Sequence, residues 1–231
     1  MANKSIDHAF TTRSLTSAAS DPTYAGALSF MRRKYTKSLK GADAVVWGIP
    51  FDAAVSNRPG ARFGPQAIRR AAAIFDNDPQ YPFDRDLFEA MAVIDYGDCL
   101  LDYGNHQKTP ATIEREASKI LASGAFLMSM GGDHFVTWPL LKAHAAKHGQ
   151  LALVQFDAHQ DTWFDDGKRI DHGSFVGRAV RALAGILLKV VEASESELPG
   201  PAQDRRTAPQ VAPAPVPLRR RDRHPPMPAP I

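Results

Sequence analysis

The sequence predicts an α/β fold in which helices flank a parallel sheet. Four short apolar runs occur along the chain, at residues 44–49, 91–96, 125–130 and 151–156. Each run is rich in aliphatic side chains and is too short for a typical helix, so we expect strands that are buried on both faces. Segments with helical periodicity separate consecutive runs, and strands that are joined by helices are typically parallel.

Two helices are expected around the first pair of strands. Residues 65–75 follow a long loop that begins at Pro50, and Pro65 suits the first turn of a helix. Residues 111–123 are amphipathic, as expected of a helix that packs on a sheet. A long structured loop at the carboxyl end of a strand usually serves a site, so residues 50–64 either border a site or merely pack against the core.

Polar clusters follow the third and fourth apolar runs. Gly131-Gly132-Asp133-His134 comes directly after the third, and Asp157, His159 and Asp161 follow the fourth at a spacing of two. A helix over residues 137–148 is expected to link the two strands as a right-handed crossover and to make them close in the sheet. The clusters then meet at the carboxyl edge, where parallel sheets carry their sites.

These clusters combine side chains that bind divalent metals. If the chain stays extended after the fourth run, Asp157, His159 and Asp161 fall on one face. Carboxylate oxygens with some imidazole nitrogen suit Mn²⁺ better than an ion that prefers thiolates. The alternative is a polar strand end whose Asp residues cap a following helix, and the spacing alone leaves both interpretations open.

Composition restricts the class of protein. The 231 residues are enough for one domain with a substantial core, and the single cysteine, Cys99, excludes an intramolecular disulfide. The N-terminus lacks an apolar secretory signal, and no apolar run is long enough to span a bilayer. We therefore expect a cytoplasmic protein with no membrane partner.

The net charge of +3 does not indicate a nucleic-acid partner. Residues 199–231 contain six Arg and two Asp, and subtracting this excess of four positive charges from +3 leaves the rest of the chain at −1. The basic character therefore belongs to one terminal segment. The remaining sequence has no basic surface of the kind that binds nucleic acid.

Several motifs together resemble the ureohydrolase family, which includes the arginases and agmatinases. They are Gly48-Ile49-Pro50-Phe51-Asp52, residues 58–65 (RPGARFGP), Gly131-Gly132-Asp133-His134 and residues 156–162 (FDAHQDT). Residues 171–175 (DHGSF) resemble the agmatinase branch in particular. The resemblance covers about residues 40–181. It implies an arginase-like three-layer fold, with a parallel sheet flanked by helices, and assembly into homo-oligomers, usually trimers or hexamers.

The resemblance also implies a function and a set of site residues. Family members hydrolyse guanidinium groups to urea with two Mn²⁺ ions per subunit, and two cations that share a carboxylate can turn water into hydroxide near neutral pH. By resemblance, His134 and Asp161 bind the first metal, Asp157 bridges both metals, and His159 binds the second. His172 occupies the position of the family's proton shuttle and would protonate the departing amine.

The loop before this shuttle bears on the choice of small-molecule guanidino substrate. Residues 162–171 contain neither Ser nor Asn, whereas arginases carry a Ser/Asn-rich loop that binds the α-carboxylate and α-amine of an amino acid. The resemblance therefore favours agmatine, which would be cleaved to putrescine and urea. Asp165 or Asp166 could meet its far ammonium, and a solvated acidic turn is the alternative. Lys168 and Arg169 keep guanidinobutyrate and guanidinopropionate open as substrates.

Three parts are expected along the chain. Residues 1–40 form an N-terminal arm, residues 41–182 a partial ureohydrolase-like domain, and residues 183–231 a divergent tail that is rich in Pro, Arg and Ala. Residues 199–231 hold ten of the eighteen prolines, and this composition predicts disorder. A reading-frame change would explain the tail, and a Pro-rich segment that binds a partner is the alternative.

Two functions remain open because the family's later Asp-x-Asp pair and its guanidinium-binding Glu have no match in this sequence. The first is an agmatinase-like, Mn-dependent hydrolase. The second is a catalytically inactive fragment, incomplete at its C-terminus, that keeps residual metal binding. Because the second metal retains only His159 and the bridging Asp157, we expect at most one tightly bound Mn²⁺ in this chain.

Overall fold

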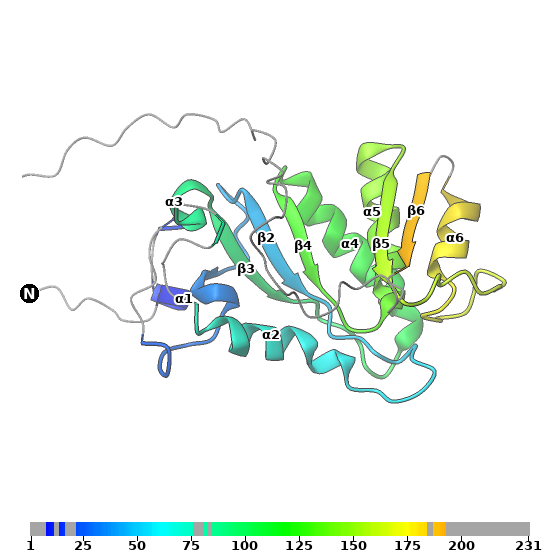
Figure 1. Cartoon of the computed structure of the whole chain (residues 1–231), viewed down its shortest axis with the longest axis horizontal. Helices are drawn as coiled ribbons and strands as arrows, with labels where there is room; N and C mark the ends of the chain where they lie inside the picture. The colour runs from blue at the N-terminus through cyan, green and yellow to red at the C-terminus, as the bar shows by residue number, and fades with distance from the viewer. Residues whose placement is uncertain are drawn as a thin grey trace, which may run out of the picture. The chain divides into compact units, whose positions relative to one another are not determined.

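The computed structural model describes residues 8–11, 14–16, 22–75, 81–82, 85–183 and 187–192. This part of the chain has an α/β fold in which parallel strands are flanked by helices (Figure 1). The predicted fold class is therefore confirmed. The strands are β1 (Lys34–Tyr35), β2 (Ala44–Gly48), β3 (Val93–Asp98), β4 (Phe126–Met130), β5 (Ala152–Asp157) and β6 (Leu187–Glu192).

Helices connect the strands and cover their faces. The α-helices are α1 (His8–Thr11), α2 (Gly64–Ala72), α3 (Leu87–Ala90), α4 (Thr109–Ala122), α5 (Thr137–His148) and α6 (Phe175–Ala182). Short 3-10 turns are η1 (Phe30–Arg32), η2 (Ala61–Phe63), η3 (His106–Lys108) and η4 (His134–Val136). Pro65 lies in the first turn of α2, where a missing N–H costs no helical hydrogen bond. None of the described helices combines the length and the apolar character needed to cross a bilayer.

The described strands form two sheets. The first sheet has the order β1, β3, β2, β4, and the second consists of β5 and β6. All strand pairs are parallel. Strand β2 lies between β3 and β4 and has partners on both edges, which explains why all five of its residues are buried.

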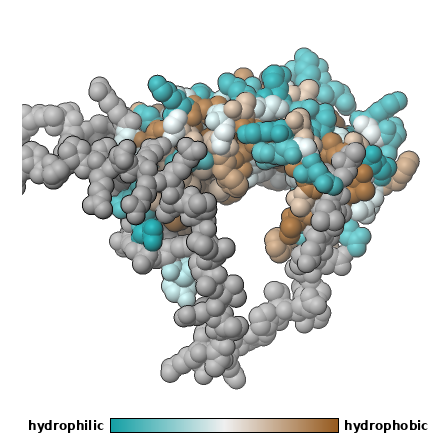
Figure 2. Space-filling model, turned by 90° about the horizontal axis from the view of Figure 1, so that it is seen from above, coloured by the Kyte–Doolittle hydropathy of each residue, from teal (hydrophilic) through white to brown (hydrophobic). Residues whose placement is uncertain are grey.

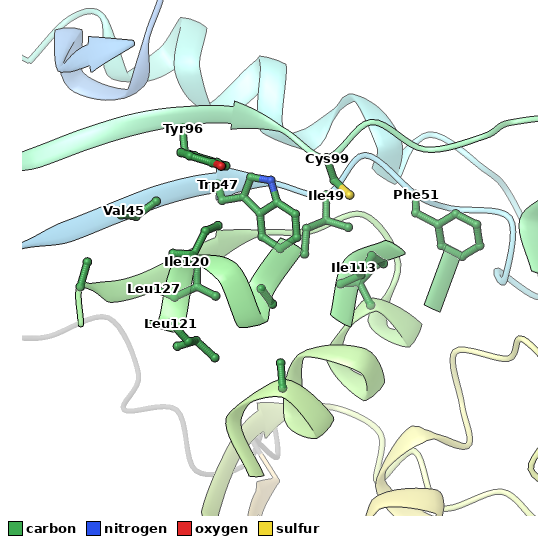
Figure 3. Packing of buried hydrophobic residues seen from close by; sticks show 14 of the residues in the cluster. Val45, Trp47, Ile49, Phe51, Tyr96, Cys99, Ile113, Ile120, Leu121 and Leu127 are labelled. Carbon is green, nitrogen blue, oxygen red and sulfur yellow. The ribbon is translucent and has the colours of Figure 1, made fainter. Parts of the chain in front are cut away.

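The core of the first sheet is built from alternate residues of β2. Val45 and Trp47 lie in one cluster with Ile120 of α4 (Figure 3), whereas Val46 lies in a second cluster with Phe88 of α3. Successive side chains of a strand point to opposite faces, so apolar residues from helices cover the first sheet on both sides. Each fully buried side chain of this size contributes about 1.5–3 kcal/mol to stability.

The second sheet has a smaller core. Leu141 of α5 packs with Phe175 and Val176 of α6, and Leu153 of β5 lies against this cluster. On the face of the molecule seen in Figure 2, patches of hydrophobic residues lie among hydrophilic ones. Two clusters therefore support the first sheet, one on each face, and a third supports the second sheet.

The position of β5 relative to β4 differs from the prediction. The sequence predicts that the crossover through α5 makes these strands close in the sheet, but among the described residues β4 pairs only with β2 and β5 only with β6. That prediction is wrong. The handedness rule applies to two strands of one sheet, and among the described residues β4 and β5 belong to different sheets.

Both ends of the described chain extend the sheets beyond the predicted domain. Strand β1 lies within the predicted arm, residues 1–40, and pairs with β3. Strand β6 lies within the predicted tail, residues 183–231, and pairs with β5 along its whole length. These short segments are therefore strands of the fold. The predicted disorder of residues 199–231 lies outside the described residues.

Candidate metal centre

A group of possible metal ligands lies where the carboxyl ends of β4 and β5 come together. His134 begins η4 shortly after β4, Asp157 ends β5, and Asp161 lies in the loop that follows. Nδ1 of His134 lies 2.7 Å from Oδ2 of Asp161 and 3.1 Å from Oδ2 of Asp157. One potential ligand atom from each residue lies within 4.8 Å of the others. The structure thus brings together three of the four predicted ligands.

Contacts between two loops fix the position of His134. Gly132 lies so close to the loop after β2 that a Cβ atom would come within 1.7 Å of the backbone oxygen of Phe51, so only glycine fits there. Next to it, the carboxylate of Asp133 accepts a hydrogen bond from the N–H of Ala54 (2.9 Å) and caps the start of η4. These contacts hold His134 in place without any metal ion.

Asp161 is held in an uncommon backbone conformation. Its φ is 50°, in the left-handed region that residues other than glycine rarely adopt. Its carbonyl oxygen accepts hydrogen bonds from the N–H groups of Val176 (3.1 Å) and Gly177 (3.4 Å) in the first turn of α6. These hydrogen bonds maintain the strained backbone of Asp161, whose carboxylate contacts His134. Backbone strain of this kind is often found at functional sites.

The charges in this group favour a cation. Burial raises the pKa of Asp161; the interaction with His134 opposes the rise, and the negative charge of Asp157 adds to it. A divalent cation between the two carboxylates would relieve their repulsion and favour both ionised forms. One imidazole and two carboxylates are donors that suit Mn²⁺, so the residues fit the predicted metal.

His159 lies beside this group. Its Nδ1 is 3.5 Å from Oδ1 of Asp157, the carboxylate oxygen other than the one nearest His134. The side chain of His159 is 83% exposed, and its carbonyl oxygen accepts a hydrogen bond from Nε2 of Gln155 (3.1 Å). Asp157 therefore presents one oxygen to each histidine, an arrangement that a bridging carboxylate requires.

A cavity of about 350 Å³ connects these residues with the predicted proton shuttle. Nε2 of His172 lies 3.0 Å from Oγ of Ser56, and its ring packs edge-on against the ring of Trp163. All five residues predicted as ligands or shuttle border this one cavity. Its lining consists of Ser56, His134, Asp157, His159, Asp161, Trp163, His172 and Gly173.

The two carboxylates predicted to meet the substrate lie outside that lining. Asp165 is buried and accepts hydrogen bonds from Nη2 (2.9 Å) and Nε (3.3 Å) of Arg178. Burial opposes the ionisation of Asp165, but hydrogen bonds from Ser174 and Arg178 outweigh it and lower the pKa. Asp166 is exposed and accepts a hydrogen bond from the N–H of Lys168 (2.9 Å). Asp165 thus ties the loop to α6.

Three residues of the site were not identified from the sequence. Ser56 lies in the loop predicted to border a site, but nothing in the local pattern distinguishes it from the other polar residues there. Trp163 directly follows residues 156–162, and an aromatic residue among so many charged ones is a signal that could have found it. Arg178 could not be found from its own neighbourhood, because its partner Asp165 lies outside α6.

Comparison with known proteins agrees with the motifs. The family model described as the arginase family matches residues 42–194, more than half of the chain. The chain belongs to the arginase family. An agmatinase of Chromobacterium violaceum is 49% identical over 177 residues, which cover 76% of this chain and 55% of that relative. An agmatinase of Neisseria meningitidis is 47% identical over 134 residues, covering 58% of this chain and 43% of the relative.

Two solved structures share the fold. The crystal structure of a hypothetical agmatinase from Burkholderia thailandensis has a TM-score of 0.76 and 41% identity, covering 83% of this chain and 62% of that chain. The proclavaminate amidino hydrolase of Streptomyces clavuligerus has a TM-score of 0.65 and 33% identity, covering 73% and 57%. These findings confirm the resemblance and the arginase-like fold. The chain spans about half the length of the curated relatives it matches.

Proposed function

We propose that this arginase-family chain carries an agmatinase-type site for the Mn-dependent hydrolysis of a guanidinium group, with agmatine as the substrate. The observation that carries the proposal is the group of His134, Asp157 and Asp161, which borders the same cavity as His172. The names of the relatives support it, since both curated relatives described above are agmatinases.

The ligands divide between two metal positions. His134, Asp161 and one oxygen of Asp157 would hold the first Mn²⁺, and the other oxygen of Asp157 with His159 would contribute to the second. A bound pair of divalent cations supplies a hydroxide nucleophile from water near neutral pH. The closeness of Asp157 and Asp161 fits this role, because a cation between two carboxylates favours the ionised form of both.

His172 would deliver a proton to the amine that leaves. It borders the cavity, and the contact with Ser56 at 3.0 Å together with the packed ring of Trp163 limits its orientations. An imidazole can both accept and donate a proton, so His172 would take one up and give it to the leaving nitrogen in each cycle. Its orientation by two neighbours is the kind of positioning that general acid catalysis needs.

Agmatine has a guanidinium at one end and an ammonium at the other. We assign the ammonium end to Asp166, because Asp166 is exposed, whereas the carboxylate of Asp165 is buried and paired with Arg178. Asp165 would then act indirectly by holding the loop in place. Guanidinobutyrate and guanidinopropionate carry a carboxylate instead, for which Lys168 and Arg169 would be the partners.

Two observations favour weaker metal binding, and therefore no turnover, in this chain on its own. The chain covers 55% of the Chromobacterium violaceum agmatinase, and among the described residues one group of three side chains can hold a metal. We therefore propose that the chain by itself binds one Mn²⁺ tightly and does not turn over agmatine. A site with few anionic ligands binds its second cation weakly.

The test is a metal and activity measurement on three proteins. After loading with Mn²⁺ and dialysis, elemental analysis should give about one Mn²⁺ per native chain and none for Asp157→Ala. The control Asp102→Ala removes an exposed carboxylate that does not line the cavity. This variant should bind as much Mn²⁺ as the native protein. Urea release from agmatine, guanidinobutyrate and guanidinopropionate is measured in parallel. Two retained Mn²⁺ per chain, or urea release above that of Asp157→Ala, would contradict the proposed limit.

A further inference from the structure

A glutamine is buried on β5 beside the candidate metal ligands. Gln155 is 6% exposed, although glutamine side chains mostly lie at the surface of folded proteins. Alternate side chains of a strand share a face, so Gln155 lies between Leu153, which packs against the cluster of α5 and α6, and Asp157. The strand therefore places an amide group at the boundary between an apolar core and the candidate metal centre.

Only one end of this amide is hydrogen-bonded within the part of the chain that the structure describes. Nε2 of Gln155 donates to the carbonyl oxygen of His159 at 3.1 Å. Because a carbonyl oxygen only accepts, the amide nitrogen must face it, and Oε1 is directed elsewhere. Oε1 is buried and has no hydrogen-bond partner among the described residues. A buried acceptor without a partner lowers stability, so stability alone does not explain a glutamine at this position.

Both polar backbone groups of His159 are bound by side chains from this face of β5. Its N–H donates to Oδ1 of Asp157 at 2.9 Å, and its carbonyl oxygen accepts from Gln155. The side chain of His159 is 83% exposed, and its Nδ1 lies 3.5 Å from the same Oδ1. The place of the imidazole beside Asp157 therefore depends on how the backbone of His159 is held.

These two hydrogen bonds respond differently to a cation. Oδ1 of Asp157 faces His159, and it is the oxygen that we assign with His159 to the second Mn²⁺. A divalent cation attracts this oxygen strongly and competes for it with the N–H of His159. The hydrogen bond from Gln155 involves no ligand side chain, so it is retained whether or not a cation is bound.

We propose that Gln155 is a positioning residue for the second metal, whose Nε2 holds the backbone of His159 so that the imidazole stays beside Oδ1 of Asp157. This inference rests on the proposed division of the ligands between two metal positions. It assigns Gln155 a role that acts through His159, and Gln155 itself contacts neither the metal nor the substrate.

Two consequences distinguish this role from general support of the fold. Loss of the Gln155 donor should weaken the second metal position and leave the first unchanged, because His134 and Asp161 are held by contacts with other loops and with α6. The same loss should not lower the stability of the metal-free protein. The buried Oε1 disappears with the donor, and the carbonyl of the exposed residue His159 can bind water instead.

The test is a titration of four proteins with Mn²⁺ alone, in which electron paramagnetic resonance measures the free ion. Gln155→Met keeps an unbranched side chain of similar length and removes the N–H donor. Gln150→Met makes the same substitution at an exposed residue before the start of β5 and is the matched control. His159→Ala removes the ligand itself, and the native chain completes the set.

We expect all four proteins to bind one Mn²⁺ with the same dissociation constant. In the native chain and in Gln150→Met, a second Mn²⁺ should bind weakly. The dissociation constant of this weak site should rise about tenfold or more in Gln155→Met, and the site should be lost in His159→Ala. The urea midpoint of metal-free Gln155→Met should be no lower than that of the native chain.

Different failures separate this inference from the proposed site. If His159→Ala abolishes the weak site and Gln155→Met leaves it unchanged, the role of Gln155 is wrong and the proposed ligands stand. If the native chain has no weak site that depends on His159, the proposed division of the ligands fails, and the inference fails with it. If Gln155→Met weakens both sites and also lowers the urea midpoint, Gln155 supports the fold in general, which overturns the inference.

Discussion

Strands β2 and β5 arise from similar apolar runs but have different surroundings. All five residues of β2 are buried, and it has a parallel partner on each edge. In β5, only Gln155 among the six residues is fully buried, and the described partner is β6 alone. The difference shows that an apolar run predicts a strand, while the burial of that strand depends on neighbours from distant parts of the chain. Strand β2 is thus paired on both edges, whereas β5 has a described partner on one edge.

The largest expected effect contrasts buried ion pairs in the two regions. Arg69 of α2 binds Asp95 of β3 through Nε (2.7 Å) and Nη2 (2.9 Å), whereas Arg178 of α6 binds Asp165 in the loop after the candidate metal ligands. Arg69→Ala should lower the free energy of unfolding by about 3–5 kcal/mol, because it leaves a buried carboxylate uncompensated in a central strand. Arg178→Ala should cost about 1–3 kcal/mol, because the loop can move and expose its carboxylate to water.

Urea denaturation of both variants measures this difference. The control is Arg70→Ala, which removes an exposed arginine adjacent in sequence and should change stability by less than about 0.5 kcal/mol. If Arg69→Ala and Arg178→Ala lowered the free energy of unfolding equally, the surroundings of the two ion pairs would be equally rigid. That result would contradict the expected difference.

A smaller effect is expected from two valines. Val45 in β2 is fully buried, and Val154 in β5 is 54% exposed. Val45→Ala should lower the free energy of unfolding by about 2 kcal/mol, because it removes buried methyl groups and leaves a cavity. Val154→Ala should change it by less than about 0.5 kcal/mol in the isolated chain. Thermal or urea unfolding checks both values, and a large loss for Val154→Ala would mean that the open face is covered in solution.

The smallest effect is on the pH dependence of stability. One carboxylate from each region has a shifted pKa, and the two shifts have opposite directions. A hydrogen bond from Arg62 lowers the pKa of Asp52 to about 2, so the ionised group stabilises the fold above its ordinary pKa of 3.8 and this contribution is lost as the pH falls towards 2. The raised pKa of Asp161 stabilises the metal-free fold below its ordinary value, and this contribution is lost as the pH rises.

Urea midpoints at a series of pH values, without metal, test these signs. Asp52→Asn should flatten the loss of stability at acid pH. Asp161→Asn should raise the midpoint at neutral pH, because it removes a carboxylate that ionises unfavourably in the fold. If the urea midpoints of both variants shifted in the same direction at neutral pH, the opposite directions assigned to the two pKa shifts would be contradicted.

Local pattern was enough to predict most elements of the fold. The apolar runs correspond to β2, β3, β4 and β5, and the helix predicted over residues 137–148 coincides with α5. Strand β3 runs from Val93 to Asp98, two residues later at its start and its end than the apolar run at residues 91–96.

The candidate site was predictable where its residues follow strand ends. His134, Asp157 and Asp161 each come at or just after such an end, so topology alone brings them near one another. Ser56 and Arg178 could not be predicted, because their roles arise from contacts between separate loops and helices. The separation of β4 from β5 was missed for the same reason, since strand pairing is a property of the assembled sheet.

The carbonyl oxygen of Asp161 links the candidate metal ligands to a helix. Because it accepts hydrogen bonds from Val176 and Gly177 at the start of α6, any shift of this residue as its carboxylate engages a cation must be transmitted to those two amides. Their NMR resonances would therefore respond to occupancy of the centre even though neither residue is a ligand. These amides would therefore report metal binding directly, without an activity assay.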